Sequence, residues 1–160
     1  MEINVLSLFL AALSTLVVGF IWYNPKVFGT IWMKESGTSE EKMKGANMLV
    51  IFVMAVVYAF LISFILQYLV IHQYSAFAAT IDIPNVDPSV YENYVNVYGK
   101  TYQTFKHGAL HGFMTGLLLA LPLIGTNALF ERRSFKYTLI TGGFWIVCFT
   151  IMGGIICGMK

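Results

Sequence analysis

Charge is scarce in this 160-residue chain: only 11% of its residues are charged, where a soluble domain usually carries about a quarter. Ten Lys and Arg against eight Asp and Glu leave a net charge of +2. That charge is too small for the basic surface of a nucleic-acid-binding protein, so we expect no nucleic-acid partner. A hydrophobic fraction of 58% and a mean hydropathy of +0.71 instead predict that the chain's main partner is the lipid bilayer.

Groups that carry covalent or redox chemistry are also few. The only cysteines are Cys148 and Cys157, about 13 Å apart along a helix, so they cannot form a disulfide, whose Cα atoms must approach within about 7 Å. The sequence has no Gly-rich phosphate loop, no nucleophile elbow and no paired carboxylates. We therefore expect no enzymatic activity and no cofactor.

Four long apolar stretches fill most of the chain, at about 3–23, 46–72, 107–130 and 137–159. Each reaches the roughly 20 residues that a helix needs to cross a hydrocarbon core of about 30 Å. Residues 1–160 are therefore predicted to form one all-α, polytopic membrane domain with four transmembrane helices. The stretches carry charges only at their ends, which counts against proton-coupled transport, because that usually needs a buried carboxylate.

Lysine and arginine beside the spans predict the orientation, since these residues accumulate in cytoplasmic connections. The first and third connections hold seven of them: Lys26, Lys34, Lys42, Lys44, Arg132, Arg133 and Lys136. The opposite side holds three: Lys100, Lys106 and Lys160. We therefore expect the first and third connections in the cytoplasm and both termini outside.

The second, outer connection carries aromatic residues every three or four positions: Tyr91, Tyr94, Tyr98, Tyr102 and Phe105. This spacing predicts an amphipathic helix at the outer membrane interface. A tyrosine-lined binding surface is the alternative.

Two local signals concern helix starts and bends. Thr38 and Glu41 have the spacing of a capping box, which predicts a helix that starts after Thr38 and runs into the second span. Pro122 removes a backbone hydrogen bond from the third span and predicts a kink there.

Small residues recur every four positions in two of the spans. In the first span they are Ser7, Ala11, Thr15 and Gly19, and in the third they are Gly108, Gly112, Gly116 and Ala120. Small residues allow helix backbones to approach closely in lipid. We therefore predict contact between the first and third spans. Self-association through one of these faces is the alternative.

Histidines are the most reactive polar groups near the spans. His107 and His111 share one helical face, and His72 ends the second span at the same level of the membrane. The cluster could serve as hydrogen-bonding interfacial residues, as a proton or substrate site, or as a metal site. No carboxylate or thiolate is placed to complete a tetrahedral ligand set. We therefore expect no bound metal, and a hydrogen bond from His111 to a neighbouring helix.

Several segments together resemble the domain-of-unknown-function 1761 family. They are WYNPKVFG at 22–29, WMK at 32–34, SEE at 39–41, HG at 111–112, ALP at 120–122, TN at 126–127, FERRS at 130–134, GGFW at 142–145 and MG at 152–153. The resemblance covers almost the whole chain apart from the second connection. It implies a small four-helix protein of the bacterial inner membrane and no known activity. The positions to which it draws attention are Trp22, Tyr23, Pro25, His111, Asn127, Glu131, Arg132, Arg133 and Trp145.

The predicted topology places two candidate sites at opposite ends of the spans. The histidines lie at the outer end, and Asn127, Glu131, Arg132 and Arg133 lie at the inner end near the tryptophan of the first span. The alternative for the inner group is a salt-bridged helix end. From these features we expect a non-enzymatic subunit that forms homo-oligomers or joins a membrane complex. The alternative is a small transporter or channel with a polar path near His72, His107 and His111.

Overall fold

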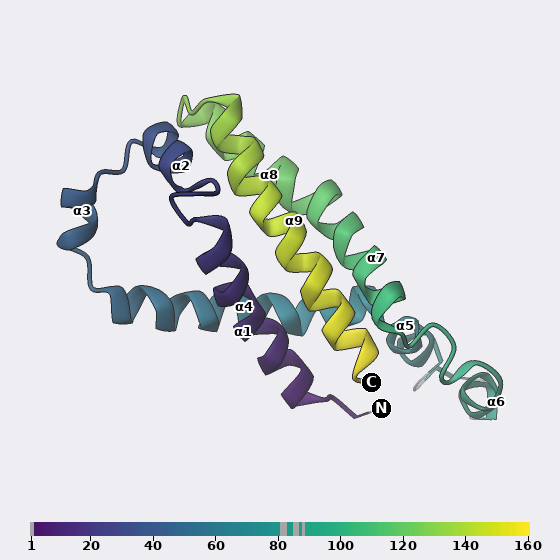
Figure 1. Cartoon of the computed structure of the whole chain (residues 1–160). Coiled ribbons are helices and arrows are strands. Elements are labelled where there is room, and N and C mark those ends of the chain that lie inside the picture. The colour runs from purple at the N-terminus through teal and green to yellow at the C-terminus, as the bar shows by residue number, and fades with distance from the viewer. Residues whose placement is uncertain (1, 81–82, 85–86, 88) are drawn as a thin grey trace.

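The computed structural model describes residues 2–80, 83–84, 87 and 89–160, and in these ranges the chain is helical with no strand. Four helical segments in the described ranges are long and apolar enough to cross a membrane. They are α1 (Val5–Trp22), α4 (Met48–Val70), Phe105–Phe130 and α9 (Phe135–Gly158). The predicted all-α fold with four membrane-span-like helices is confirmed. In Figure 1, α4 crosses the direction of the other three.

Helix α9 lies at the centre of the bundle. Half of its most apolar window is buried, the largest share among the four span-like helices of the described chain. Its side chains Cys148, Met152 and Ile156 are almost completely buried and form a core with residues from α1 and α4. Both cysteines are buried and unpaired, as their spacing predicts.

The third span packs its glycines against α9. A Cβ atom at Gly108 would clash with the carbonyl oxygen of Gly153, and one at Gly112 would clash with the carbonyl oxygen of Phe149. Gly116 likewise leaves room for the backbone of Ile146. The two backbones touch because both helices place small residues at the crossing.

The predicted contact between the first and third spans is therefore wrong. Within the described residues, α1 packs against α4 and α9 instead. Its small residues Ser7, Ala11 and Thr15 are buried, and the hydroxyl of Ser63 in α4 donates to the carbonyl oxygen of Leu8 at 3.1 Å. A stripe of small residues permits close approach of a second helix but does not determine which helix packs against it. Here α9 lies between the two stripes and contacts both helices.

The third span is built from three pieces: α7 (Phe105–Thr115), a π-helical turn η1 (Gly116–Ala120) and α8 (Leu121–Phe130). The N–H of Leu121 bonds to the carbonyl oxygen of Gly116, five residues back. This wider turn directly precedes Pro122, whose ring would clash with a carbonyl of the preceding turn in a regular helix. A widened turn thus accompanies the proline at which we predicted a bend.

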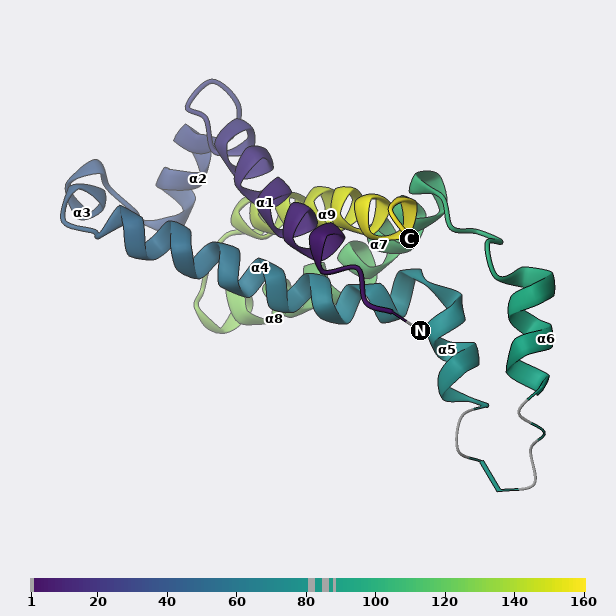
Figure 2. The ribbon, with the colours of Figure 1, turned by 90° about the horizontal axis from the view of Figure 1, so that it is seen from below.

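Short helices occupy the connections. Helices α2 (Gly29–Ser36) and α3 (Glu40–Lys44) follow α1, and α5 (His72–Ala78) and α6 (Ser89–Tyr98) follow α4. Figure 2 shows α3 and α6 at opposite ends of the molecule. Helix α6 confirms the first part of the helix expected in the second connection, with Tyr91, Tyr94 and Tyr98. The prediction is wrong beyond Tyr98, because Tyr102 has a positive φ and Phe105 begins α7.

The start of the second span differs from the prediction. Ser39, rather than Thr38, is the N-cap of α3, and its hydroxyl accepts a hydrogen bond from the backbone N–H of Lys42. Helix α3 then ends before Gly45, and Asn47 caps α4 separately by accepting the N–H of Val50. The continuous helix fails because Asn prefers a cap, where its side chain bonds to the free N–H groups of a new helix.

The two ends of the bundle hold different groups. Both termini, α5 and α6 lie at one end (Figure 1). We call it the histidine end because His72 begins α5 and His107 lies in the first turn of α7. The side-chain amide of Asn4 donates to the carbonyl oxygen of Met159 at 2.9 Å and ties the termini together. Helix α2 and the turn at 131–134 lie at the opposite end, which we call the basic end.

Candidate functional site

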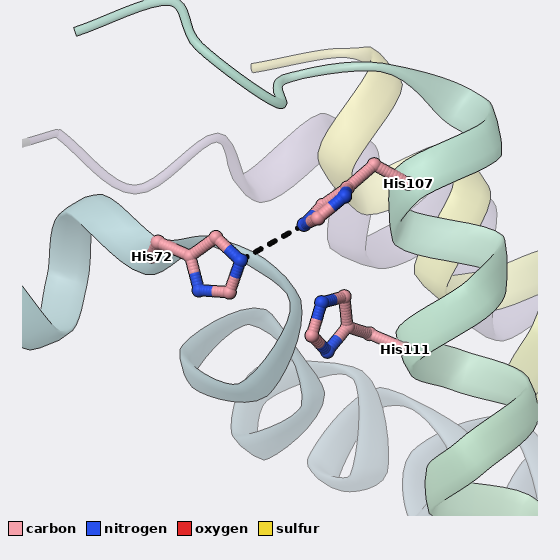
Figure 3. A group of neighbouring side chains, drawn as sticks. All are labelled: His72, His107 and His111. Atoms are coloured by element: carbon pink, nitrogen blue, oxygen red, sulfur yellow. Dashed lines mark hydrogen bonds between the residues drawn. The ribbon is translucent and has the colours of Figure 1, made fainter. Parts of the chain in front are cut away.

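Three imidazoles converge at the histidine end, one from α5 and two from α7 (Figure 3). The Nε2 atoms of His72 and His107 are 2.9 Å apart. One ring nitrogen from each of His72, His107 and His111 lies within 4.8 Å of the other two. The sequence prediction that topology brings the three together is confirmed. The predicted hydrogen bond from His111 to a neighbouring helix is wrong. In the described chain, the hydrogen bond between imidazoles joins His72 and His107.

The positions at which α5 and α7 begin bring the three histidine side chains together. His72 is the first residue of α5, directly after Ile71, whose extended backbone ends α4. His107 lies near the start of α7, where its backbone N–H donates to the side-chain hydroxyl of Thr104, the N-cap residue, at 3.2 Å. Gly108 and Gly112 each follow a histidine and face α9. The histidine face is therefore turned about 100° away from α9.

Gln73 fastens α5 to the connection that precedes α7. Its side chain is 97% buried, and its Nε2 lies 3.1 to 3.3 Å from the carbonyl oxygens of Tyr98, Gly99 and Thr101. Because Gln73 adjoins His72, this bonding holds His72 close to His107. Gln73 was not among the predicted site residues. Its only sequence signal is that a second polar residue follows His72 at the end of an apolar stretch.

Tyr74 fastens α5 to α4 in a similar way. Its hydroxyl donates to the side-chain oxygen of Gln67 at 3.1 Å. Burial raises the pKa of the Tyr74 hydroxyl above its ordinary value, so this group keeps its proton and stays a donor near neutral pH. The two residues that follow His72 thus tie α5 to the connection before α7 and to α4.

Tyrosines surround the imidazoles. The ring of Tyr102 stacks on His107, with centroids 4.9 Å apart and planes inclined by 24°. The backbone of Tyr102 has φ of +66°, in the left-handed region that aromatic residues seldom adopt. A hollow of about 290 Å³ opens beside His72 and is lined by His72, Tyr94, Tyr98, Thr101 and Tyr102. The tyrosine-lined surface that the sequence left as an alternative thus adjoins the histidines.

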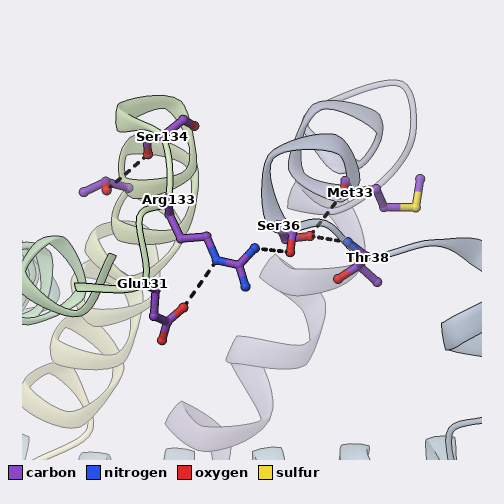
Figure 4. A network of polar contacts seen from close by, with 7 residues as sticks. Met33, Ser36, Thr38, Glu131, Arg133 and Ser134 are labelled. Carbon is purple, nitrogen blue, oxygen red and sulfur yellow. Dashed lines mark hydrogen bonds and ion pairs between the residues drawn. The ribbon is translucent and has the colours of Figure 1, made fainter. Parts of the chain in front are cut away.

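At the basic end, polar side chains bond mainly across segments. Arg133 donates to the carbonyl oxygen of Ser36 in α2 and pairs with Glu131 at 3.3 Å (Figure 4). Ser134 donates to the carboxylate of Glu35. These contacts join the start of α9 to α2, as the alternative of a salt-bridged helix end predicts.

The other predicted positions divide between the bundle and its surface. The indole N–H of Trp22 donates to the carbonyl oxygen of Ile140 in α9 at 3.0 Å, and the ring of Tyr23 packs against Phe144 of α9. Asn127 and Arg132 are exposed. The structure therefore brings Trp22 and Tyr23 to α9 but leaves Asn127 and Arg132 outside the bonded group.

A groove of about 670 Å³ runs between α1, α4 and α9. Tyr23, Pro25 and Trp145, three of the positions to which the family resemblance draws attention, line it together with Phe52 and Ala55 of α4. Its walls are almost wholly apolar. The volume lies within the roughly 300–1,000 Å³ typical of ligand pockets.

Comparison with known protein families gives a match over most of the chain. A family model described as "Protein of unknown function (DUF1761)" matches residues 6–157. No curated protein and no solved structure matches the chain. The match covers nearly the whole sequence and confirms the resemblance seen in its motifs. With its four span-like helices, this integral membrane protein of unknown activity belongs to the DUF1761 family.

Proposed function

We propose that this protein is a non-enzymatic membrane component that pairs with a second copy of itself through the first half of α4. One observation carries the proposal: residues 48–58 lie outside the bundle, and each is exposed or only half-buried. Only 17% of the most apolar window of α4 is buried, against 50% for α9. A helix that leaves its own bundle offers a long surface to another chain.

The groove beside this half-helix supports a second copy as the occupant. The groove and the uncovered half of α4 belong to the same chain and border each other, because Ile51, Phe52 and Ala55 line it. Two copies related by a two-fold axis can therefore place each half-helix against the other's groove, as in an isologous interface. Since lipid gives no hydrophobic drive for association, close packing along the apolar walls must supply the attraction.

Cysteine cross-linking in membranes tests this pairing. We expect Ala55→Cys, on the groove, to give an oxidised dimer. Leu123→Cys, on the exposed face of α8, should stay monomeric and serves as the control. The native cysteines are buried and can remain. Equal cross-linking of both variants, or a monomer with lipid bound in the groove, would contradict the proposal. Cross-linking to a different protein would favour the accessory-subunit form.

The alternative of a small transporter or channel gains little from the side chains of the suggested path. Gln67 bonds to the hydroxyl of Tyr74 and to the carbonyl oxygen of Phe64. The hydroxyl of Thr115 donates to the carbonyl oxygen of His111 in its own helix. These groups are used in local bonds, and Asn127 lies on the surface. We therefore retain self-association as the proposed function.

The lysine and arginine distribution supports an orientation with the histidine end outward, in the bacterial inner membrane that the family resemblance implies. Cysteines at Lys136, at the basic end, and at Asn96, in α6, test the orientation, since both positions are exposed. A membrane-impermeant thiol reagent applied to intact cells should label Asn96→Cys and leave Lys136→Cys unlabelled. The reverse pattern would invert the proposed orientation.

A further inference from the structure

The three imidazoles lie close to the spacing of a metal site. In a tetrahedral zinc site with Zn–N distances of about 2.0–2.1 Å, the ligand nitrogens are about 3.3 Å apart. Here His72 and His107 approach at 2.9 Å, and one nitrogen of each of the three histidines lies within 4.8 Å of the other two. A movement of about 1.5 Å at the ring tips reaches the required spacing, and rotation about the broad χ2 torsion of histidine can supply it.

We propose that His72, His107 and His111 bind one divalent transition-metal ion, Zn²⁺ or Cu²⁺, at the histidine end, with a fourth coordination position open to the tyrosine-lined hollow. The proposal reverses the expectation drawn from the sequence, which rested on the need for a fourth protein ligand. Open zinc sites use three protein ligands and a water molecule. Three histidines are therefore sufficient.

The ligand atoms select the class of metal. Imidazole nitrogen suits Zn²⁺, Cu²⁺ and Ni²⁺, whereas Ca²⁺ and Mg²⁺ require oxygen ligands. The histidines form the only group of three or more potential metal ligands found in the described part of the chain. The bond between the two Nε2 atoms uses a proton of one ring and a lone pair of the other. A metal ion would replace that bond and engage all three rings.

The surrounding residues hold the site in place. Gln73 ties His72 to the connection before α7, and Thr104 caps the helix that carries His107. Tyr102 stacks on the ring of His107 from the hollow side. Groups hydrogen-bonded to metal-ligating side chains typically change metal affinity by 10- to 100-fold when mutated. Gln73 and Thr104 act instead through the backbone that carries the histidines. The contacts of Gln73, Thr104 and Tyr102 therefore favour a binding role for the histidine rings.

Metal content of the purified full-length protein tests the proposal. After equilibration with Zn²⁺ and dialysis, elemental analysis should find about one Zn²⁺ per chain. The variants His72→Ala, His107→Ala and His111→Ala should each retain less than a tenth of that amount. Lys106→Ala is the matched control, since Lys106 is exposed and adjoins His107, and it should bind Zn²⁺ fully. Cu²⁺ should displace Zn²⁺, as the order of metal affinities requires.

Two results would overturn the proposal: less than a tenth of a Zn²⁺ per chain in the unmodified protein, or full retention by the triple His→Ala variant. His111→Gln, which keeps much of the side-chain volume, guards against a variant that fails to fold, and its folding is checked by gel filtration. X-ray absorption by the zinc-loaded unmodified protein needs no variant. It should show nitrogen ligands at about 2.0 Å with imidazole scattering, and a shell of oxygen atoms alone would also refute the site.

Discussion

The two ends of this helical bundle differ in the groups of polar side chains that meet there. At the basic end, Trp22 and Arg133 donate to backbone carbonyl oxygens of other segments, those of Ile140 and Ser36. At the histidine end, the imidazoles of His72 and His107 meet each other beside a hollow. A side chain bonded to a distant backbone carbonyl stabilises the fold. A set of side chains bonded among themselves and open to a hollow is available to a ligand.

The two ends also differ in the role of their residues with positive φ. Among the described residues, each end has one non-glycine residue with positive φ: Arg132 at +55° and Tyr102 at +66°. Arg132 is exposed in the short turn between α8 and α9, where it helps the chain reverse. Tyr102 holds its ring against His107. Such backbone strain costs about 1–3 kcal/mol and is often found at ligand sites. At Arg132 the positive φ closes a turn, and at Tyr102 it positions the tyrosine ring against His107.

The largest expected effect comes from breaking the α7–α9 contact on which the histidine end is built. Gly112→Leu would force a side chain into the backbone of Phe149 and should destabilise the protein by about 3 kcal/mol, the upper range for overpacking. It should also abolish zinc binding by moving His111. Thermal unfolding in detergent measures the first effect. Gly19→Ala, whose Cβ would lie 3.7 Å from Phe144, is the control and should be tolerated. An unchanged melting temperature for Gly112→Leu would refute the packing.

Gln73→Leu tests the bonding that holds His72 near His107 at the histidine end. The change leaves the carbonyl oxygens of Tyr98, Gly99 and Thr101 without their shared donor, at a cost of about 1–3 kcal/mol. Zinc affinity should fall roughly 10-fold or more, because His72 is no longer held near His107. Titration with Zn²⁺ measures this loss. Gln103→Leu, in the same connection, is the control, and equal affinities for the two variants would contradict the role of Gln73.

Arg133→Ala tests the basic end. It removes the bonds to Ser36 and Glu131 and should cost about 1 kcal/mol, because the arginine side chain is 35% exposed and solvent weakens the pair. Zinc affinity should not change. Lys136→Ala, at an exposed site in the first turn of α9, is the control for loss of charge. A fall in zinc affinity for Arg133→Ala alone would mean that the two ends are coupled.

Arg132→Gly should have the smallest effect. Glycine adopts positive φ without steric cost, so the variant should gain up to about 1 kcal/mol of stability. Arg132→Ala keeps the strained backbone and should gain nothing. Comparing the two melting temperatures isolates the backbone contribution, and an equal change in both would point to the lost charge instead.

The spans and the meeting of the histidines could be predicted, because both follow from local spacing. His107 and His111 are one helical turn apart, and the length of each span fixes the level at which His72 emerges. The partner of Gly112 could not be predicted, since a glycine stripe fits any helix with its own small residues. Gln73 escaped for a similar reason: its three acceptors are backbone carbonyls whose positions only the folded connection defines.

One measurement tests most directly whether binding belongs to the histidine end and structural support to the basic end. It is the stabilisation by Zn²⁺ of the unmodified protein, Arg133→Ala and His111→Ala, measured by thermal unfolding. At a zinc concentration about 100 times the dissociation constant, binding to the folded state should add about 2.7 kcal/mol. We predict this gain for the unmodified protein and for Arg133→Ala, and none for His111→Ala. The same gain in all three proteins, or its loss in Arg133→Ala, would contradict the account.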